Sequence, residues 1–600
     1  RVSPKQLIFR LIKIIKNKFI HNNDFLIDLL YSKKENIRSN TSFKPLFINY
    51  VETDQDAADK ILENEFQFLN KEFKFNKINW NKIDDNYSIL WLYEFNYFNY
   101  LSLVIGEYNR NKDYKYIDKA VSLTENWIEE TEVAQEISWD PYPTSRRIVN
   151  WINAVNYLER KGLTSKDNLN KIKKSIFLQT SFLNSNLEYD LNNNHLTSDL
   201  KALIFSGIFF EGKEADKWLN KGISQLKKRR QIEVLKDGFH DERSSSYHMV
   251  TLKDYLEIYL LLKRNKIEHG LDLDSTIEKM FETLLVLIRP NLKLPLLNDS
   301  VEDYPINVQE LMAVGAYLFK RKDFKWCAQG ASLDYFKNIY SEKDYQEYKK
   351  IGIEKPAVKT NLFKDAGYFI YRDGWEKEDR YLIFDFDSIN PKYCPGHSHS
   401  DDLSFELYAG GEVLLLDPGV YSYHDENLRE YFKSTKNHNT ISINDNNKSK
   451  LIDKFRVSKT GKTKLLNYSN DDQQTRIKAV NIDYKGNKHK REINIEQDDI
   501  FLVDEIEFKK NKVNKVEAFF NLAPYFSRLE LLSNNQVKCL FDNVVLTIQI
   551  EDNLNLGKIK IEESLVSYKW NELFKSKKLV YCLKAEKNVK LKTKISISNR

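Results

Sequence analysis

The chain has 600 residues, 41% of them apolar and 30% charged, so it is long enough to need at least two hydrophobic cores. A net charge of +6, from 93 basic and 87 acidic residues, argues against a nucleic-acid partner but allows a local basic cleft. Four scattered cysteines without CxxC spacing exclude a zinc knuckle and a disulfide framework, and no apolar run approaches the roughly 18 residues of a membrane span.

Residues 1–44 are expected to form a basic helical extension. The first twenty residues, RVSPKQLIFRLIKIIKNKFI, are basic and amphipathic. They lack the uninterrupted apolar region and the cleavage site of a signal peptide, so the chain gives no sign of export and a cytoplasmic location stays open.

Residues 45–350 carry the helical period. In STIEKMFETLLVLIRP, apolar residues recur at the i, i+3, i+4, i+7 spacing of one buried face, with Ser275 as the expected cap and Pro290 at the end. Many such helices joined by short connectors predict stacked helical hairpins. A solenoid and a closed α/α toroid fit this pattern equally well. A linker rich in Lys and Glu is expected at 341–358.

From residue 357 the period changes to two. Leu382 and Phe384 alternate with Ile383 and Asp385, and strand-like runs recur to the end of the chain. This pattern predicts an antiparallel β-sandwich over residues 357–600.

The densest cluster of reactive residue types is PGHSHSDDLSFELYAGGEVLLLDPG, residues 395–419. Its Ala409-Gly410-Gly411 segment separates two strand-like runs, so a hairpin should turn there and return Asp417 to the end of the sheet where His399 lies. His438 directly precedes another strand. Two imidazoles and one carboxylate suit zinc, with a fourth position left for water. Each of these three residues, taken alone, is most simply an ordinary hydrogen-bonded side chain. Only the expected proximity of all three favours a metal site.

Two polar clusters precede helices in the first half. The first, LNNNHL at residues 191–196, is most simply explained as an asparagine that caps a helix, followed by a surface histidine. DGFHDERSSSYHMV, residues 237–250, is by itself a polar helix entry. Neither cluster indicates a function alone.

In order along the chain, these motifs resemble the heparinase II/III family, which includes heparin, heparan sulfate and related alginate lyases. The matching segments are NNHL, DG-x-H-x-ER-(x)3-YH, GH-x-H-x-D, LDPG-x-Y and HNT, preceded by W-x-Y-x-FNYFNYL from Trp91 and WDPYP-x-x-x-R from Trp139. The resemblance implies an incomplete N-terminal α/α toroid followed by a C-terminal antiparallel β-sandwich, with the active site in the cleft between them. It also implies a periplasmic or secreted protein.

The resemblance assigns roles at the matching positions. The residues implied in catalysis are Asn194, His195, Tyr247 and His397. The residues implied to bind one structural divalent metal, expected to be zinc, are His399, Asp417 and His438. The residues implied to contact substrate are Arg243, Arg147 and Trp139.

The implied reaction is β-elimination on an anionic uronate polysaccharide. It removes the C5 proton beside the uronate carboxylate, so amide and imidazole donors from Asn194 and His195 would stabilise the charge that builds up there. Tyr247 can act as the base or as the acid to the departing O4, with His397 in the complementary role. Products would carry a 4,5-unsaturated uronate.

Three alternatives stay open. His397–Asp402 partly matches the HxHxDH motif of metallo-β-lactamase-like hydrolases, but Asp402 stands where that motif needs a histidine. A glycan-binding protein without catalysis can use the same scaffold. A lyase of bacterial surface-polysaccharide assembly or turnover would show the same residues. The sequence leaves open which glycan is used, whether cleavage is endo or exo, and the oligomeric state.

Overall fold

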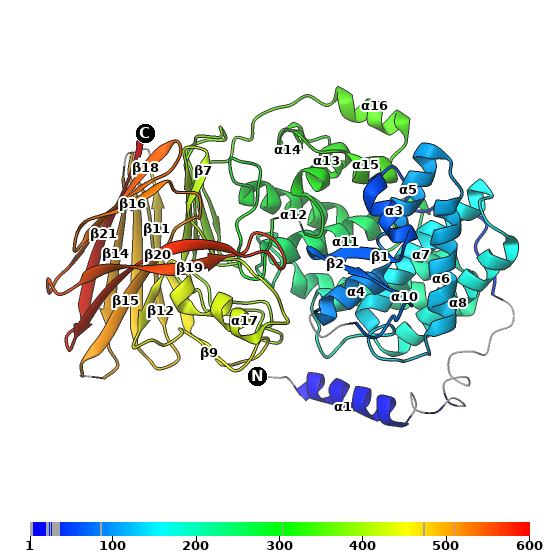
Figure 1. Ribbon diagram of the computed structural model, residues 1–600, viewed down its shortest axis with the longest axis horizontal. Coiled ribbons are helices and arrows are strands. Elements are labelled where there is room, and N and C mark those ends of the chain that lie inside the picture. The colour runs from blue at the N-terminus through cyan, green and yellow to red at the C-terminus, as the bar shows by residue number, and fades with distance from the viewer. Residues whose placement is uncertain are drawn as a thin grey trace. The chain divides into compact units, whose positions relative to one another are not determined.

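The structure, a computed structural model, falls into two compact units (Figure 1). The described residues are 4–19, 23, 26, 37–83, 87–302, 304–471, 474–497, 499–510 and 512–600. The helical unit comprises 1–234, 250–281 and 309–354, and the sheet unit comprises 235–249, 282–308 and 355–600. Within the predicted extension at 1–44, residues 4–19 form a helix and residues 23, 26 and 37–44 are also described, while the others lie outside the described residues.

The helical unit is built from paired helices. Consecutive helices pack together as α5 with α6, α7 with α8 and α9 with α10, and α9 also packs against α7. The helices are α1 (Pro4–Phe19), α3 (Gln55–Leu62), α4 (Ile89–Tyr97), α5 (Leu101–Asn111), α6 (Lys115–Glu130), α7 (Pro141–Lys161), α8 (Lys166–Ser185), α9 (Asn194–Phe209), α10 (Lys213–Glu233), α11 (Ser245–Arg264), α12 (Leu273–Leu287), α13 (Val308–Phe319), α14 (Lys322–Cys327), α15 (Asp334–Ile339) and α16 (Glu342–Lys350), and the unit also holds the hairpin of β1 (Glu65–Phe68) and β2 (Lys71–Lys74).

The helical period predicted α12 correctly, with one error at its start. The apolar face of this helix is buried, and Met280 and Leu284 have no exposed surface. The helix begins at Leu273, so Ser275 lies inside it and is not its cap. The Ser275 hydroxyl instead donates to Asp272, 2.7 Å away. The predicted linker at 341–358 contains the short helix α16, whose first turn is closed by a capping box at Ser341.

The described residues of the sheet unit form three larger antiparallel sheets and one small ribbon. Their strand orders are β3-β4-β5-β6-β7, β11-β12-β13-β14-β21-β18-β17-β16, β19-β20-β15-β8 and β10-β9. The strands are β3 (Asn361–Phe363), β4 (Tyr368–Arg372), β5 (Tyr381–Asp385), β6 (Phe405–Ala409), β7 (Glu412–Leu415), β8 (Ile441–Ile443), β9 (Lys450–Leu451), β10 (Val457–Lys459), β11 (Lys462–Asn470), β12 (Thr475–Ile482), β13 (Lys488–Ile495), β14 (Asp499–Glu507), β15 (Asn514–Asn521), β16 (Arg528–Ser533), β17 (Gln536–Leu540), β18 (Val544–Asp552), β19 (Lys558–Val566), β20 (Phe574–Ala585) and β21 (Val589–Asn599).

One continuous apolar core joins these sheets. It takes Leu382 and Phe384 from β5, Leu502 from β14 and Phe520 from β15. The predicted hairpin is confirmed: β6 and β7 pair antiparallel, and Gly410 and Gly411 make the turn with φ of 61° and 88°. Both glycines are needed because side chains rarely adopt that conformation. The turn returns the chain to the end of the sheet that carries the site.

Two segments of the first half group with the sheet unit. Asp237 accepts hydrogen bonds from the backbone of Asp365 and Ala366, at 2.9 and 2.8 Å. The Arg372 guanidinium, on β4, donates to the carbonyl of Val286, and Glu406, on β6, accepts from the backbone of Leu296. These polar contacts join residues more than 80 positions apart, which a local sequence pattern does not reveal. The predicted domain boundaries stay predictions.

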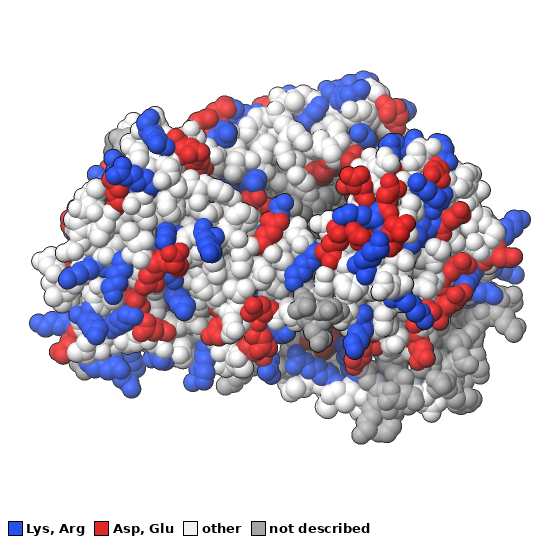
Figure 2. Space-filling model, in the orientation of Figure 1, with Lys and Arg blue, Asp and Glu red and all other residues white. Residues whose placement is uncertain are grey.

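Charge is mixed on the surface. Figure 2 shows basic and acidic side chains interspersed over the visible face, in keeping with the small net charge. Among the described residues, no helix combines the length and apolarity that a bilayer crossing requires.

Candidate active site

Tyr247 and His397 form a stacked pair within the sheet unit. Tyr247 lies in the first turn of α11, and its ring centroid is 3.9 Å from that of His397, with 7° between the planes. The Nδ1 atom of His397 contacts the carboxylate of Glu242. Because an ionised carboxylate can only accept, Nδ1 carries the proton and Nε2 is the basic nitrogen. Glu242 is buried, so it fixes this orientation of the imidazole.

A chain of hydroxyl groups leads away from Tyr247. The Tyr247 hydroxyl lies 3.1 Å from that of Tyr423, which donates to Oδ2 of Asp299 at 3.0 Å. Since the single proton of Tyr423 goes to Asp299, its oxygen is free to accept from Tyr247. Burial, together with the nearby Tyr423 and Asp299, raises the pKa of Tyr247 well above its usual value. Tyr247 is therefore protonated and is poised to donate.

Asp299 is the centre of this polar network. It accepts from the Arg429 guanidinium, with 2.7 Å to Nη2, and from Nε2 of His399 at 2.9 Å. Burial alone would raise the pKa of Asp299, but Arg429 and His399 outweigh burial and hold it far below the usual carboxyl range. The carboxylate is therefore ionised. Arg429, on α17 (Glu426–Lys433), also donates to the carbonyl of Gly396, just before His397.

His399, Asp417 and His438 converge on one point. One ligand atom from each residue lies within 4.8 Å of the others, and all three residues are buried. Asp417 follows β7, and His438 directly precedes the segment that leads into β8. The sequence predicted that the hairpin would bring Asp417 close to His399, and the structure confirms that these side chains lie together.

The hydrogen bonds of these three residues fit a cation. His399 uses Nε2 on Asp299, and its Nδ1 is buried without a hydrogen-bond partner among the described residues. His438 directs Nε2 at the carbonyl of Phe432, 3.1 Å away, so its Nδ1 presents a lone pair to Asp417 at 2.9 Å. Two acceptors that close need a proton or a metal between them. Accordingly, and despite burial, Asp417 raises the pKa of His438.

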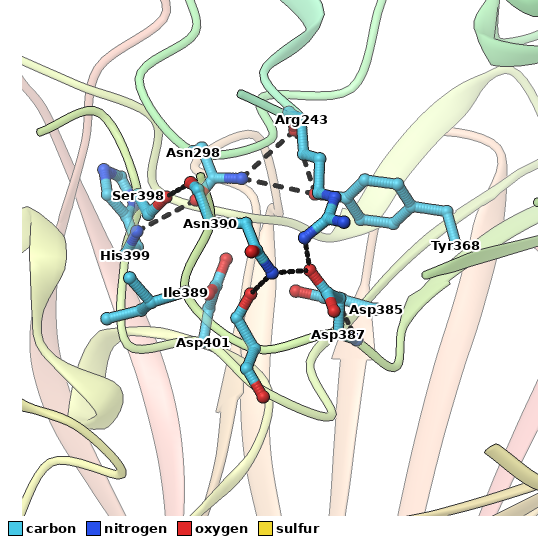
Figure 3. Close-up of a pocket in the computed structure, with 11 residues that line it drawn as sticks. Arg243, Asn298, Tyr368, Asp385, Asp387, Ile389, Asn390, Ser398, His399 and Asp401 are labelled. Carbon is cyan, nitrogen blue, oxygen red and sulfur yellow. Dashed lines mark hydrogen bonds and ion pairs between the residues drawn. The ribbon is translucent and has the colours of Figure 1, made fainter. Parts of the chain in front are cut away.

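Arg243 lines a small acidic pocket in the sheet unit (Figure 3). Figure 3 shows its guanidinium directed at Asp387, with which it forms an ion pair. The Arg243 backbone has a φ of 57°, and its carbonyl accepts from Asn298 and Tyr368. Burial lowers the pKa of Arg243. Its charge is already neutralised by Asp387, so a substrate anion would have to compete with that carboxylate. The predicted substrate contact stays a prediction.

Asn194 and His195 open α9 in the helical unit, at the helix start predicted from the sequence. Asn193 is the N-cap and accepts from the backbone of His195. The His195 ring stacks on Tyr142, with centroids 4.0 Å apart, and Nδ1 lies 3.2 Å from the Glu188 carboxylate. Nδ1 therefore carries the proton, as in His397.

Arg147 and Trp139 are buried in the helical unit, and their predicted contact with substrate stays a prediction. Arg147 has no exposed surface: its guanidinium lies 3.8 Å from the Trp127 ring and donates to Gln179 at 2.8 Å. Trp139 is 3% exposed and packs on Trp127 and Phe182. Neither side chain offers a surface to a glycan. The motif that contains them serves packing in this structure.

Sequence reasoning missed four residues of the site: Glu242, Asp299, Tyr423 and Arg429. Glu242 stands inside the DERSSSYH segment, and Tyr423 lies four residues after the LDPG motif, so both were near a signal. Asp299 had none, because it lies in an irregular segment 130 positions from its partner Arg429.

Two family models cover most of the chain. The model described as Heparinase II/III N-terminus matches residues 17–326, and the one described as Heparinase II/III-like, C-terminal matches residues 355–598. The chain belongs to the heparinase II/III family.

Relatives and solved structures agree with this assignment. A heparin-sulfate lyase of Bacteroides thetaiotaomicron is 27% identical over 388 residues, which are 60% of this chain and 53% of the relative. One of Pedobacter heparinus is 24% identical over 459 residues, 72% of this chain and 65% of the relative. The chain thus aligns with less than two thirds of either relative.

The solved structures establish the fold. A crystal structure of heparinase III covers 100% of this chain and 94% of its own, with a TM-score of 0.78 and 21% identity. A heparan sulfate lyase of Pedobacter heparinus covers 91% and 83%, with a TM-score of 0.66 and 19% identity. The helical unit is an α/α toroid and the sheet unit an antiparallel β-sandwich, as the resemblance implied.

Proposed function

We propose that this chain is a polysaccharide lyase that cleaves a uronate-containing anionic glycan of the heparan sulfate class by β-elimination. The observation that carries the proposal is the stacked Tyr247–His397 pair, in which one partner is a held proton donor and the other a held base. The names of the curated relatives, heparin-sulfate lyases, support this substrate class. The 4,5-unsaturated uronate is the expected product.

Tyr247 is the proton donor to the departing O4. The raised pKa keeps its hydroxyl protonated, and that proton is available once the substrate oxygen takes the place of Tyr423 as the acceptor. The Tyr423 hydroxyl, itself anchored on ionised Asp299, holds the donor in place until then. Positioned proton transfer of this kind contributes about 10² to 10⁴ in rate.

His397 is the base that takes the C5 proton. Glu242 holds a proton on Nδ1, so in the neutral ring the lone pair lies on Nε2. When Nε2 takes the substrate proton, the imidazole becomes a cation, and the buried carboxylate of Glu242 stabilises it. The Glu242 carboxylate is already in place when the His397 ring becomes positively charged. This preorganised ion pair lowers the activation free energy of the proton transfer.

Asn194 and His195 keep the role that the resemblance implied, as donors to the uronate carboxylate. Because Nδ1–H of His195 is directed at Glu188, donation to the substrate comes from Nε2 and needs the doubly protonated ring, whose charge Glu188 balances. Stacking on Tyr142 and the contact with Glu188 fix the His195 ring. A fixed donor stabilises the charge that develops at the carboxylate without reorganising during the reaction.

A divalent cation, zinc by the donor set of two imidazoles and one carboxylate, fits His399, Asp417 and His438. When bound, it would supply a structural tie between separate strand ends. The His399 ring would then be fixed between the cation and Asp299, which supports the loop that begins with His397. Proton transfer itself needs only the side chains of the protein.

The hydrolase alternative is less well supported. Asp402 accepts from Thr463 and Asn481, at 2.7 and 3.0 Å, and it is not part of the metal-binding group. The HxHxDH arrangement that such hydrolases require therefore lacks the histidine of its sixth position.

The proposal is tested by incubating the full chain with a panel of uronate polysaccharides and following the ultraviolet absorbance of the new C4–C5 double bond. Heparan sulfate is expected to give the strongest signal, and Tyr247→Phe is the matched inactive control. Fragments whose masses include an added water would replace the lyase with a hydrolase. No cleavage of any member by wild-type protein would favour a glycan-binding role.

A further inference from the structure

Helix α1, labelled near the N-terminus in Figure 1, has an unusual composition. Its sixteen residues, PKQLIFRLIKIIKNKF, include five basic side chains and no acidic one. The catalytic proposal does not use this helix. An amphipathic helix in a protein surrounded by water normally turns its apolar stripe toward the core.

In α1 the apolar side chains face outward instead. The six exposed aliphatic residues are Leu7 (51%), Ile8 (55%), Leu11 (57%), Ile12 (42%), Ile14 (60%) and Ile15 (54%). At 3.6 residues per turn they form one continuous arc of about 160° around the helix, bounded by Ile14 and Ile12. This is a face, not a scatter of single exposed residues.

The opposite side of α1 holds it to the helical unit. The Gln6 amide donates to the carbonyl of Asp190, 2.9 Å away, and Gln6 is buried. Phe9 stacks on Tyr189 with centroids 5.0 Å apart, and the Lys16 ammonium donates to the carbonyl of Ser185. The helix thus docks through the side that carries Gln6 and Phe9, and this leaves the aliphatic arc uncovered by the described residues of its unit.

Basic residues border the arc. On the helical wheel, exposed Arg10 follows the Ile14 edge, displaced by about 40°. Lys16 follows the Ile12 edge at the same displacement, but its ammonium is directed at the Ser185 carbonyl on the docked side. Long basic side chains at the edges of an apolar face can place their charges at the level of lipid phosphates while the aliphatic residues enter the acyl region. A helix of this length spans about 24 Å, which is short of a bilayer's apolar thickness of about 30 Å, so such a helix lies along the surface.

We propose that α1 is a membrane-surface helix that inserts its aliphatic arc into an anionic lipid bilayer. An anionic bilayer offers both an apolar interior for the six aliphatic side chains and negative headgroups for the basic ones. Two copies of the chain packed arc to arc would gather basic residues along one seam, with no acidic residue in either helix to balance them. An anionic glycan would match the charge but offers no apolar surface of that size.

The experiment is co-sedimentation of the full chain with lipid vesicles. Vesicles of phosphatidylcholine with about 30% phosphatidylglycerol are compared with pure phosphatidylcholine, at low and at high salt. Binding is expected to be at least ten-fold tighter to the anionic vesicles and to weaken as salt rises. The comparison of vesicle types and salt concentrations separates the electrostatic contribution to membrane binding from the apolar contribution.

The variant Leu11→Glu/Ile15→Glu changes the centre of the arc. It is expected to lose at least ten-fold in vesicle affinity while its melting temperature stays that of wild type, because both side chains are more than half exposed. Ile353→Glu, at another exposed aliphatic residue of the helical unit, is the matched control and should bind like wild type.

Three outcomes would overturn the proposal. They are equal binding to neutral and anionic vesicles, no binding to either, and unchanged binding by the double variant. Light scattering in the absence of lipid adds a fourth. A dimer that the double variant converts to a monomer would make the arc a self-association face. Lyase activity on a soluble glycan is measured separately, so failure of this proposal leaves the catalytic one untouched.

Discussion

Tyr423 and His399 donate to opposite oxygens of the same carboxylate, Asp299, at 3.0 and 2.9 Å. Tyr423 contacts the proposed acid Tyr247, and His399 is one of three candidate metal ligands. One buried side chain therefore links the two halves of the site. A change at the candidate metal ligand His399 is expected to reach Tyr247 through three hydrogen bonds, by way of Asp299 and Tyr423.

Asp299→Asn should strongly destabilise the sheet unit. The variant keeps the shape of the side chain but leaves the fully buried Arg429 guanidinium without its counter-charge. Breaking one partner of a buried pair costs about 3–5 kcal/mol. Denaturant unfolding should show that loss. A stability within about 1 kcal/mol of wild type would contradict the central role of Asp299.

Metal analysis of protein never exposed to chelator should find one divalent ion per chain. Chelator is expected to lower the melting temperature and the activity together, and added zinc should restore both. His399→Ala removes the ligand whose Nδ1 is otherwise unpartnered and should abolish the stoichiometric ion. His489→Ala is a control that removes a buried imidazole of the sheet unit outside the candidate group. Full metal content in His399→Ala would disprove this ligand set.

The sequence predicted best those features that rest on short-range patterns. The change of period near residue 357, the Gly410-Gly411 turn and the convergence of His399 with Asp417 follow from local spacing. The long-range polar contacts could not be predicted from local spacing. Asp299 has no periodicity or motif around it, and its role depends on α17, which arrives from 130 positions away.

Burial was the second feature that the sequence did not reveal. Arg147 and Trp139 belong to a motif of the family, and a polar or aromatic residue in a motif reads as a ligand contact. Their partners Trp127 and Gln179 lie on neighbouring helices, so only the fold shows that they face the interior. A motif can preserve packing as readily as chemistry.

Arg147→Ala should therefore act on stability and not on substrate binding. It removes a buried stack on Trp127 and leaves Gln179 and the carbonyl of Asn96 without their donor. A loss of about 2–4 kcal/mol is expected from the cavity and the unsatisfied groups. KM, measured well below the melting temperature, should stay within about two-fold of wild type. A large rise in KM at unchanged stability would restore the substrate contact.

The turnover number kcat should not fall when the pH rises moderately above neutral. If Tyr247 donates a proton, activity needs its protonated form, which is lost only as pH rises through its pKa. That pKa is raised well above its ordinary value, so donation should persist to about pH 10 in a kcat profile. The stability of wild-type protein over the same range is the control. A fall in kcat centred near pH 8, with the fold intact, would show that another group supplies the limiting proton. A kcat that rises with pH into the alkaline range would instead show that Tyr247 acts as the base.

Tyr247→Phe is the decisive substitution, because it removes one hydroxyl and keeps the ring that stacks on His397. Turnover should fall by about 10² to 10⁴ while substrate affinity stays nearly constant, since the lost interaction belongs to the transition state. Tyr423→Phe is the matched control: it also removes one hydroxyl, but from the residue that only positions the donor, so its loss should be much smaller. Asn194→Ala should lower turnover through charge stabilisation and leave a measurable residue of activity. Near wild-type turnover by Tyr247→Phe would remove it as the proton donor and bring forward a glycan-binding role for the chain.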